Sequence, residues 1–311
     1  MPTLLSWNVE NWQGDDEDRM EGIADFLSDL DPDCLFLYEL MGGEAVLQDL
    51  CARLKDRLPS SDWGYVFQSK GASDSRHCGF LYNRQCVSVQ RRVWNPDEFP
   101  RTNEFQRQLW EHKTGFDERD HRMYGLHRVI VVKATFGDGD PCTLIGCHLK
   151  SMVEFRHKPG KLTAQEKRTI QIWSLQEFLE TQTTQCLVMG DFNSESHESC
   201  AASSTSCNAT TVPLDEGGVV SHVRAQNALP TWRQRGSHHH KFAPANLDLL
   251  YASEGLDARL TVVDSCVGGV DLSDHNVLRI DLHTPRLTLP VVHQASPGSK
   301  SKRRDPSKRR R

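Results

Sequence analysis

Two polar side chains follow an apolar stretch in the middle of the chain. Residues 186–189 are apolar and predict a short buried strand, and Gly190, Asp191 and Asn193 come shortly after it. A carboxylate can bind a hard cation or accept a proton, and a carboxamide can orient a water molecule or a phosphate oxygen. Asp-x-Asn also occurs in turns whose side chains bond nearby backbone. On its own, the pair indicates either a turn or a chemical site.

Similar polar residues occur at or near the ends of other apolar, strand-like runs. They are Asn8, Glu10, Glu39, His148, Asp248, Asp274 and His275. One buried carboxylate is usually satisfied by its neighbours, but so many strand ends with Asn, Glu, Asp and His are hard to explain by packing. Ligands of open α/β sheets gather at strand ends. The set therefore predicts a site for a divalent metal ion and a phosphate group.

Helices and strands alternate between these residues. Apolar residues at helical spacing predict one helix over 20–30, ended by Pro32, and another over 46–58. The capping box Thr163-x-x-Glu166 opens a third helix. Further strands are predicted at 63–68, 79–82, 87–93, 129–136 and 260–266. This order predicts an α/β protein.

The motifs, taken in order, resemble those of the endonuclease/exonuclease/phosphatase superfamily. They are Trp7-Asn8-Val9-Glu10, Glu39, His148-Leu149-Lys150-Ser151, Gly190-Asp191-Phe192-Asn193, Asp248 and Ser273-Asp274-His275. With the flanking strands, the resemblance covers about nine-tenths of the chain. It implies a four-layer α/β sandwich, with two packed mixed β-sheets flanked by helices, as in deoxyribonuclease I. A His at the position of His148 resembles the branch that contains deoxyribonuclease I and sphingomyelinases. Abasic-site endonucleases lack this His.

The resemblance also implies a metal cofactor. One Mg²⁺ ion, for which Mn²⁺ can substitute, would be bound by Glu39 and Asn8, with Glu10 or Asp274 nearby. Mg²⁺ is a hard ion that suits oxygen ligands. It would neutralise a phosphate oxygen and stabilise the leaving oxygen.

The implied catalytic residues are His148, Asp191, Asn193, Asp248 and His275. Asp248 would accept a hydrogen bond from His275 and fix its tautomer. His275 would then deprotonate the attacking water or, as imidazolium, bind the phosphate, and Asp191 is the alternative base. Asn193 would orient the water or the phosphate. His148 would donate to a phosphate oxygen or protonate the leaving group.

The substrate is left open among three functions. The first is a metal-dependent phosphodiesterase, namely a nuclease that acts on DNA. In this function Arg128 would contact phosphate, although Arg128 could equally form a surface salt bridge. The second is a phosphodiesterase or phosphatase acting on a small-molecule or lipid phosphate. The third is a non-catalytic nucleic-acid-binding protein, against which the intact motif positions argue.

Composition agrees with a globular enzyme. Of the 311 residues, 25% are charged and 37% are hydrophobic, which suits a packed core. The motifs span residues 1–284, so we expect one catalytic domain, and we expect a monomer. No apolar run approaches the roughly 20 residues needed to span a bilayer, and the first strand begins by Thr3, which leaves no room for a secretory signal. We therefore expect an intracellular protein, in the cytoplasm or, in a eukaryote, the nucleus.

Two segments depart from this pattern. Residues 196–246 are polar and aperiodic, and predict a long loop over the active face. Residues 285–311 carry nine Lys or Arg and one Asp, a net charge of +8, which leaves −13 for residues 1–284 of a chain whose total is −5. Such tails are usually disordered, but this one could tether nucleic acid or act as a nuclear import signal. The tether would consist of Lys300, Lys302, Arg303, Arg304, Lys308, Arg309, Arg310 and Arg311.

Overall fold

The computed structural model of the chain describes residues 1–69, 76–93, 98–112, 129–151, 162–195, 211–233 and 244–283. The basic tail, with its expected tether residues, lies outside the described residues, as does Arg128. Parts of the segment 196–246 lie outside them as well.

The first sheet contains six of the described strands. Its order is β11-β14-β1-β2-β4-β3, and β1 and β2 run parallel. The bounds are β1 Thr3–Trp12, β2 Cys34–Leu40, β3 Trp63–Gln68, β4 His77–Asn83, β11 Asp257–Val263 and β14 Val277–His283.

The second sheet also contains six of the described strands. Its order is β5-β6-β7-β8-β10-β9, with β7 and β8 parallel and β10 antiparallel to β8. The bounds are β5 Val87–Arg92, β6 Val129–Phe136, β7 Cys142–His148, β8 Cys186–Asp191, β9 Val220–His222 and β10 Asp248–Ser253. A small hairpin of β12 Cys266–Val267 and β13 Val270–Asp271 stands apart from both sheets.

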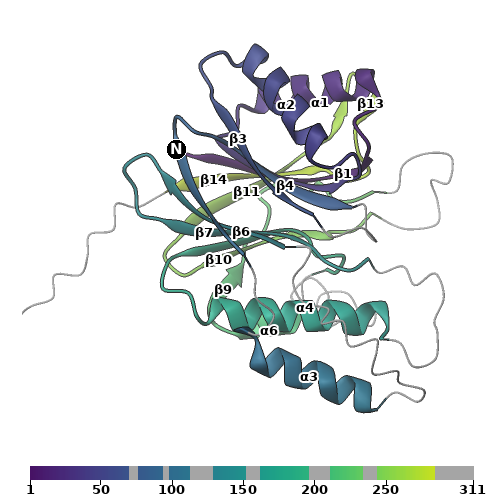
Figure 1. Cartoon of the computed structure of the whole chain (residues 1–311), viewed down its shortest axis with the longest axis vertical. Coiled ribbons are helices and arrows are strands. Elements are labelled where there is room, and N and C mark those ends of the chain that lie inside the picture. Colours follow the sequence, from purple (N-terminus) through teal and green to yellow (C-terminus); the bar gives the residue numbers. More distant parts are fainter. Residues whose placement is uncertain are drawn as a thin grey trace, which may run out of the picture.

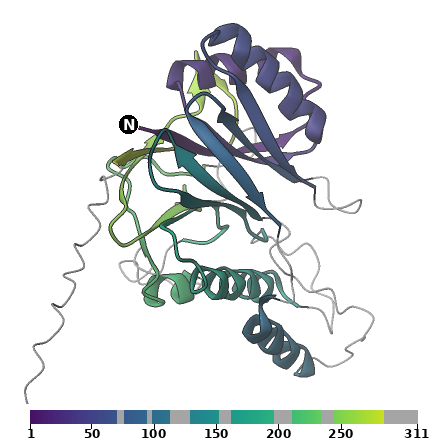
Figure 2. The same ribbon diagram turned by 60° about the vertical axis from the view of Figure 1, so that its left-hand side comes forward.

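Helices cover the outer faces of the two stacked sheets. They are α1 Glu17–Leu30, α2 Glu44–Arg57, α3 Pro100–Glu111, α4 Ala164–Leu179 and α6 Val212–Glu216. Figure 1 shows α1 and α2 above the first sheet, and α4 and α6 below the second with α3 outside them. Figure 2 shows the same layers after a turn of the molecule. The predicted four-layer α/β sandwich is confirmed.

The alternation of side chains along each strand fills three buried layers. Leu187 and Met189 of β8 pack between the two sheets, where Phe36 of β2 also lies. Val188 points to the opposite face and packs with Phe178 of α4. Because both faces of β8 are covered, its residues form a continuous apolar run rather than an alternating one. A third cluster fills the space between the first sheet and the helices α1 and α2.

The predicted helices are present, with capping groups that explain their limits. The Asp16 side chain accepts a hydrogen bond from the Arg19 backbone N–H at the start of α1. The predicted capping box of α4 is formed, with Thr163 and Glu166 bonding each other's backbone N–H. Both features follow directly from the local sequence.

Helix α3 was not predicted from the sequence. Its twelve residues are mostly polar, and its amino-terminal N–H groups are bound by a side chain of another helix, since Glu177 of α4 accepts from the backbone of Arg101 and Thr102 at 3.1 and 2.9 Å. A tertiary contact of this kind leaves no local signal in the sequence.

Several predicted boundaries differ from the structure by one to three residues, and two segments differ in the elements they contain. The strand predicted over 260–266 ends at Val263, because Cys266 belongs to the separate β12–β13 hairpin. The segment 196–246, predicted as one long loop, contains α6 and β9 among its described residues. These elements are short, and they are held by contacts with α4 and β10 rather than by a periodic pattern of their own.

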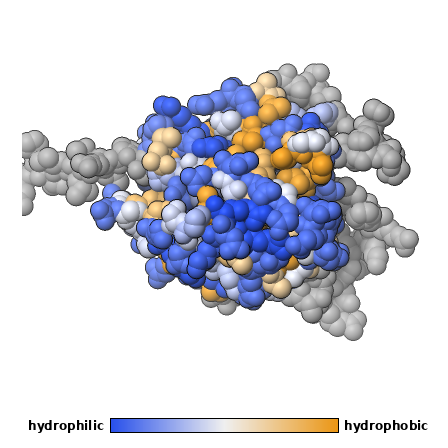
Figure 3. Space-filling view, turned by 90° about the horizontal axis from the view of Figure 1, so that it is seen from above, coloured by the Kyte–Doolittle hydropathy of each residue, from blue (hydrophilic) through white to orange (hydrophobic). Residues whose placement is uncertain are grey.

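The surface over α1 and α2 is largely hydrophilic, with one hydrophobic patch, when the molecule is seen from above in Figure 3. Arg53 and Arg57 of α2 pair there with Glu17, Glu21 and Asp25 of α1.

Within the described ranges, no helix has the length and apolar character needed to cross a membrane.

Candidate active site

The predicted residues converge on one edge shared by both sheets. The parallel pairs β1–β2 and β7–β8 run toward this edge, which lies on the right in Figure 1, away from the end marked N. Strand β10 runs the other way and begins there, so Asp248 pairs with Asp191, which in turn pairs with His148. Strand direction and register thus place residues far apart in sequence side by side.

His275 is held by Asp248. Its Nδ1 lies 2.7 Å from Asp248 Oδ2, which matches the predicted pairing. Its Nε2 lies 3.7 Å from Asp274 Oδ1 and 4.0 Å from Asp191 Oδ2. Burial disfavours the imidazolium, but the charge and hydrogen bond of Asp248, with the charges of Asp191 and Asp274, raise the pKa of His275 to about 10.

Asp191 lies at the centre of the site and is 1% exposed. Its Oδ1 accepts from the Asn193 backbone N–H at 2.8 Å, and its Oδ2 accepts from the side-chain amides of Asn193 and Asn8 at 3.0 and 3.1 Å. Burial raises the pKa of Asp191 to about 7, and the nearby His275 charge opposes this shift. A carboxylate tuned in this way can exchange a proton near neutral pH.

His148 connects the two sheets. Its Nε2 lies 3.4 Å from Glu39 Oε1 on the first sheet and 3.7 Å from Asp191 Oδ2 on the second. The side chain is 1% exposed. An imidazole between two carboxylates can carry a proton to or from a bound oxygen atom.

The first sheet is irregular where its site residues lie. The predicted strand continues past Asn8 to Trp12, and its pairing with β2 shifts between those two residues. Glu10, Asn11 and Glu39 have positive φ angles of 46°, 50° and 63°, which non-glycine residues rarely adopt. The Asn11 backbone N–H donates to Glu39 Oε2 at 3.1 Å, and the Glu10 N–H to Asn8 Oδ1 at 3.0 Å. Strained backbone of this kind clusters at functional sites.

Asp274 carries a buried oxygen suited to a cation. Its Oδ2 accepts from Trp232 Nε1 at 3.0 Å, whereas Oδ1 is buried without a hydrogen-bond partner among the described residues. Burial, and then the negative charge of Glu39, raise the pKa of Asp274, although His275 acts against them. A buried anionic oxygen without a donor is an expected feature of a cation ligand.

The residues expected to bind a metal do not form a complete set of protein ligands in the described part of the chain. Among the described residues, no three His, Cys, Asp or Glu side chains form a group that could hold a metal alone. Mg²⁺ keeps several waters and needs only one or two carboxylates besides substrate phosphate. Glu39 and Asp274, with Asn8 and Glu10, are the oxygen donors that this edge would offer such an ion.

Residues 231–233 were missed by sequence reasoning. Thr231 Oγ1 accepts from the Asp248 backbone N–H at 2.9 Å, and Trp232 forms isolated bridges with both Ala245 and His275. This short stretch therefore contacts both His275 and Asp248, the residue that holds it. It lies in the segment predicted as loop, and an isolated Thr-Trp pair gave no periodic signal.

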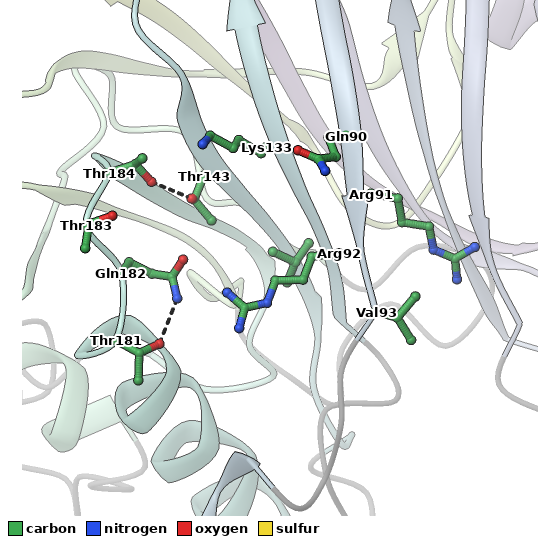
Figure 4. A pocket seen from close by; sticks show the side chains of 11 residues that line it. Gln90, Arg91, Arg92, Val93, Lys133, Thr143, Thr181, Gln182, Thr183 and Thr184 are labelled. Atoms are coloured by element: carbon green, nitrogen blue, oxygen red, sulfur yellow. Dashed lines mark hydrogen bonds between the residues drawn. The ribbon is translucent and has the colours of Figure 1, made fainter.

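A cavity of about 450 Å³ lies elsewhere, at the other end of β7. Figure 4 shows Gln90, Arg92, Lys133 and Thr143 lining it together with Thr181–Thr184, which follow α4. Most of the side chains that line this cavity are polar. The cavity is not part of the site at the opposite end of the strands.

Comparison with known proteins identifies the family of the chain. The model of the Endonuclease/Exonuclease/phosphatase family matches residues 5–275. A comparison with curated proteins found no match.

Several solved structures share the fold. A Bacteroides thetaiotaomicron protein of the endonuclease/exonuclease/phosphatase family has a TM-score of 0.59 at 17% identity, covering 90% of this chain and 97% of its own. D. rerio TDP2, complexed with single strand DNA product, has a TM-score of 0.56 at 16% identity, covering 91% and 99%. The B. thetaiotaomicron mannosyl-6-phosphatase Bt3783 has a TM-score of 0.54 at 14% identity, covering 91% and 100%. At these identities the likeness shows the fold alone. Because the family model spans residues 5–275, the chain belongs to the endonuclease/exonuclease/phosphatase family.

Proposed function

We propose that the protein is a Mg²⁺-dependent phosphodiesterase that hydrolyses DNA. The observation that carries the proposal is the buried group of His148, Asp191, Asp248 and His275 beside Glu39 at one edge of two sheets. Phosphodiester hydrolysis needs an aligned water, groups that bind the charged phosphate and a donor for the leaving oxygen. This edge offers a candidate for each.

Asp191 is our candidate for the general base. Three donors fix its carboxylate, and burial places its pKa near the operating range of a base. Asn193 lies beside it, so its amide can turn between Asp191 and a bound water. In this assignment the water gives its proton to Asp191 as its oxygen bonds to phosphorus.

His275 and His148 are then left for the phosphate and the leaving group. His275 lies 2.7 to 4.0 Å from three carboxylates, which favour its imidazolium form, and its Nε2 can donate to a phosphate oxygen. His148 can give its proton to the leaving alkoxide when the bond from that oxygen to phosphorus breaks. Glu39, Asn8 and Asp274, with Glu10, would hold Mg²⁺, which supplies charge neutralisation at the phosphate.

DNA is favoured as substrate by two observations. D. rerio TDP2, a structural neighbour, has been solved with a single strand DNA product. The tail of this chain carries a charge of +8, which suits a polyanion with many phosphates better than a small phosphate ester. The second candidate is a small phosphate ester, which the structural likeness to a mannosyl-6-phosphatase favours.

A substrate comparison tests the proposal. The purified chain would be assayed with plasmid DNA, RNA, abasic duplex, sphingomyelin, inositol phosphates and a sugar phosphate, each with Mg²⁺ or EDTA. We expect Mg²⁺-dependent cleavage of DNA that Asp191→Asn removes. Turnover of only a sugar phosphate would support the second candidate, and no turnover of any ester would contradict both.

A further inference from the structure

Arg19 joins two parts of the candidate site that are far apart in sequence. It lies in the first turn of α1, and its guanidinium reaches the end of β1 and the loop before His275. Its Nη2 donates to the carbonyl of Val9, to that of Glu10 at 3.2 Å and to that of Leu272 at 2.8 Å. Its Nε donates to Leu272 as well, at 3.1 Å. One side chain therefore binds three backbone carbonyls.

Two of these carbonyls, those of Val9 and Glu10, lie where the first sheet is irregular. The pairing of β1 with β2 is interrupted between Asn8 and Trp12, and Glu10 and Asn11 there have left-handed backbone conformations. Backbone carbonyls that leave a sheet ladder need other donors. The fixed fork of a guanidinium can supply several donors in one geometry, which an ammonium group cannot.

The two segments joined by Arg19 carry expected metal ligands. Glu10 follows Val9, and Asp274 comes two residues after Leu272. The Asp274 backbone N–H donates to Glu10 Oε2 at 3.2 Å, and Ser273 Oγ donates to the Asn8 carbonyl at 2.6 Å. A small shift between the segments would therefore change the spacing of Asn8, Glu10 and Asp274 together.

We propose that Arg19 is a positioning residue that sets the spacing between Glu10 and Asp274 and thereby the affinity of this edge for a divalent cation. The inference rests on the proposed function, because it assumes that the edge binds a cation. Arg19 itself bonds backbone carbonyls rather than the cation or the substrate.

A simple charge effect predicts the opposite result, so the two explanations can be separated. If Arg19 acted only as a positive charge near Glu10 and Asp274, its removal would tighten cation binding. If Arg19 acts by position, its loss weakens binding although a repelling charge has been removed. Substitution of a residue that orients metal ligands without binding the metal typically changes metal affinity by roughly 10- to 100-fold.

The experiment measures Mn²⁺ binding to the full chain by titration calorimetry, without substrate. The variants are Arg19→Gln, which loses charge and fork, and Arg19→Lys, which keeps the charge. The matched control is Arg53→Gln. Arg53 of α2 also binds α1, through ion pairs with Glu17 and Glu21, but it does not contact the site. Circular dichroism and thermal unfolding in EDTA report the folding of each variant, and Arg19→Lys decides the question if the Gln variant does not fold.

We expect Arg19→Gln to weaken Mn²⁺ binding on the order of tenfold or more, Arg19→Lys to weaken it less, and Arg53→Gln to lower thermal stability with unchanged affinity. Mn²⁺ binding by both Arg19 variants as tight as in the unaltered chain, or tighter, would overturn this inference alone. No Mn²⁺ binding by the unaltered chain would overturn the proposed metal dependence, and this inference with it.

Discussion

The two halves of the site are built by different means. On the second sheet, His148, Asp191 and Asp248 occupy neighbouring positions of regular strands, so the ladder itself brings them together. On the first sheet, Glu10 and Glu39 lie in left-handed backbone at an interrupted ladder, and Arg19 binds the carbonyls of Val9 and Glu10 there. Regular pairing positions His148, Asp191 and Asp248, whereas irregular backbone positions Glu10 and Glu39, two of the residues assigned to the cation. Substitutions in the second-sheet half should therefore impair proton transfer, and substitutions in the first-sheet half should impair cation binding.

The largest effect is expected on the cation half. Glu39→Gln should nearly abolish diester hydrolysis, because an amide cannot replace the carboxylate charge opposite a divalent cation. The measurement is the initial rate with Mg²⁺ added or chelated. Glu44→Gln, an exposed substitution nearby in α2, is the control and should keep the full rate. Undiminished turnover in EDTA would rule out the assigned role of the metal.

The proton-transfer half should show large but smaller losses. Asp191→Asn and His148→Ala should each lower kcat by roughly 10²- to 10⁴-fold, the range for positioned acid–base groups, and His275→Ala, which removes the imidazolium assigned to the phosphate, should lower it by a similar factor. His112→Ala, at an exposed position after α3, is the matched control. If His148→Ala kept full activity, the contact of His148 with both sheets would have no role in the reaction.

The pH profile should identify Asp191 as the group that limits activity in acid. Its pKa is raised to about 7 by burial, and the base acts only when it is ionised. Activity should therefore be present above pH 7 and lost as pH falls, with kcat/KM declining by about tenfold per pH unit on the acid side. A profile that stays flat to pH 5 would contradict the assignment of Asp191 as the base.

The smallest effect on chemistry is expected from the tail. Deleting residues 285–311 should weaken DNA binding and flatten its salt dependence, since the log–log slope scales at about 0.9 per phosphate contacted and four lost contacts would change it by roughly 3–4. Turnover of a short model diester should not change. Equal DNA affinity and equal slope with and without the tail would show that the tail is no tether.

The regular half of the site could be predicted from the sequence. The apolar run before Asp191 fixes a buried strand, and polar residues after such runs predict a shared edge. The capping box at Thr163 likewise placed α4 correctly. These signals are local, so a single chain carries them.

The irregular half could be predicted only in part. Asn8, Glu10 and Glu39 were identified from the family motifs, but nothing local indicates that β1 continues past Asn8 through an interruption to Trp12. Arg19 and Trp232 bond groups more than 40 residues away at Leu272 and Asp274, and such contacts have no local pattern. The same reason explains why helix α3, bound by Glu177, was missed.

A double-variant cycle tests most directly whether the two halves form one active site. The rate of DNA diester hydrolysis would be measured in Mg²⁺ and in EDTA for the unaltered chain, Glu39→Gln, Asp191→Asn and the double variant. Residues that act in one step show strongly non-additive losses. We predict Mg²⁺-dependent hydrolysis that either single change nearly removes, with the double variant about as slow as the slower single variant. Losses that multiply, or a rate that is the same in EDTA, would contradict a single site built across the two sheets.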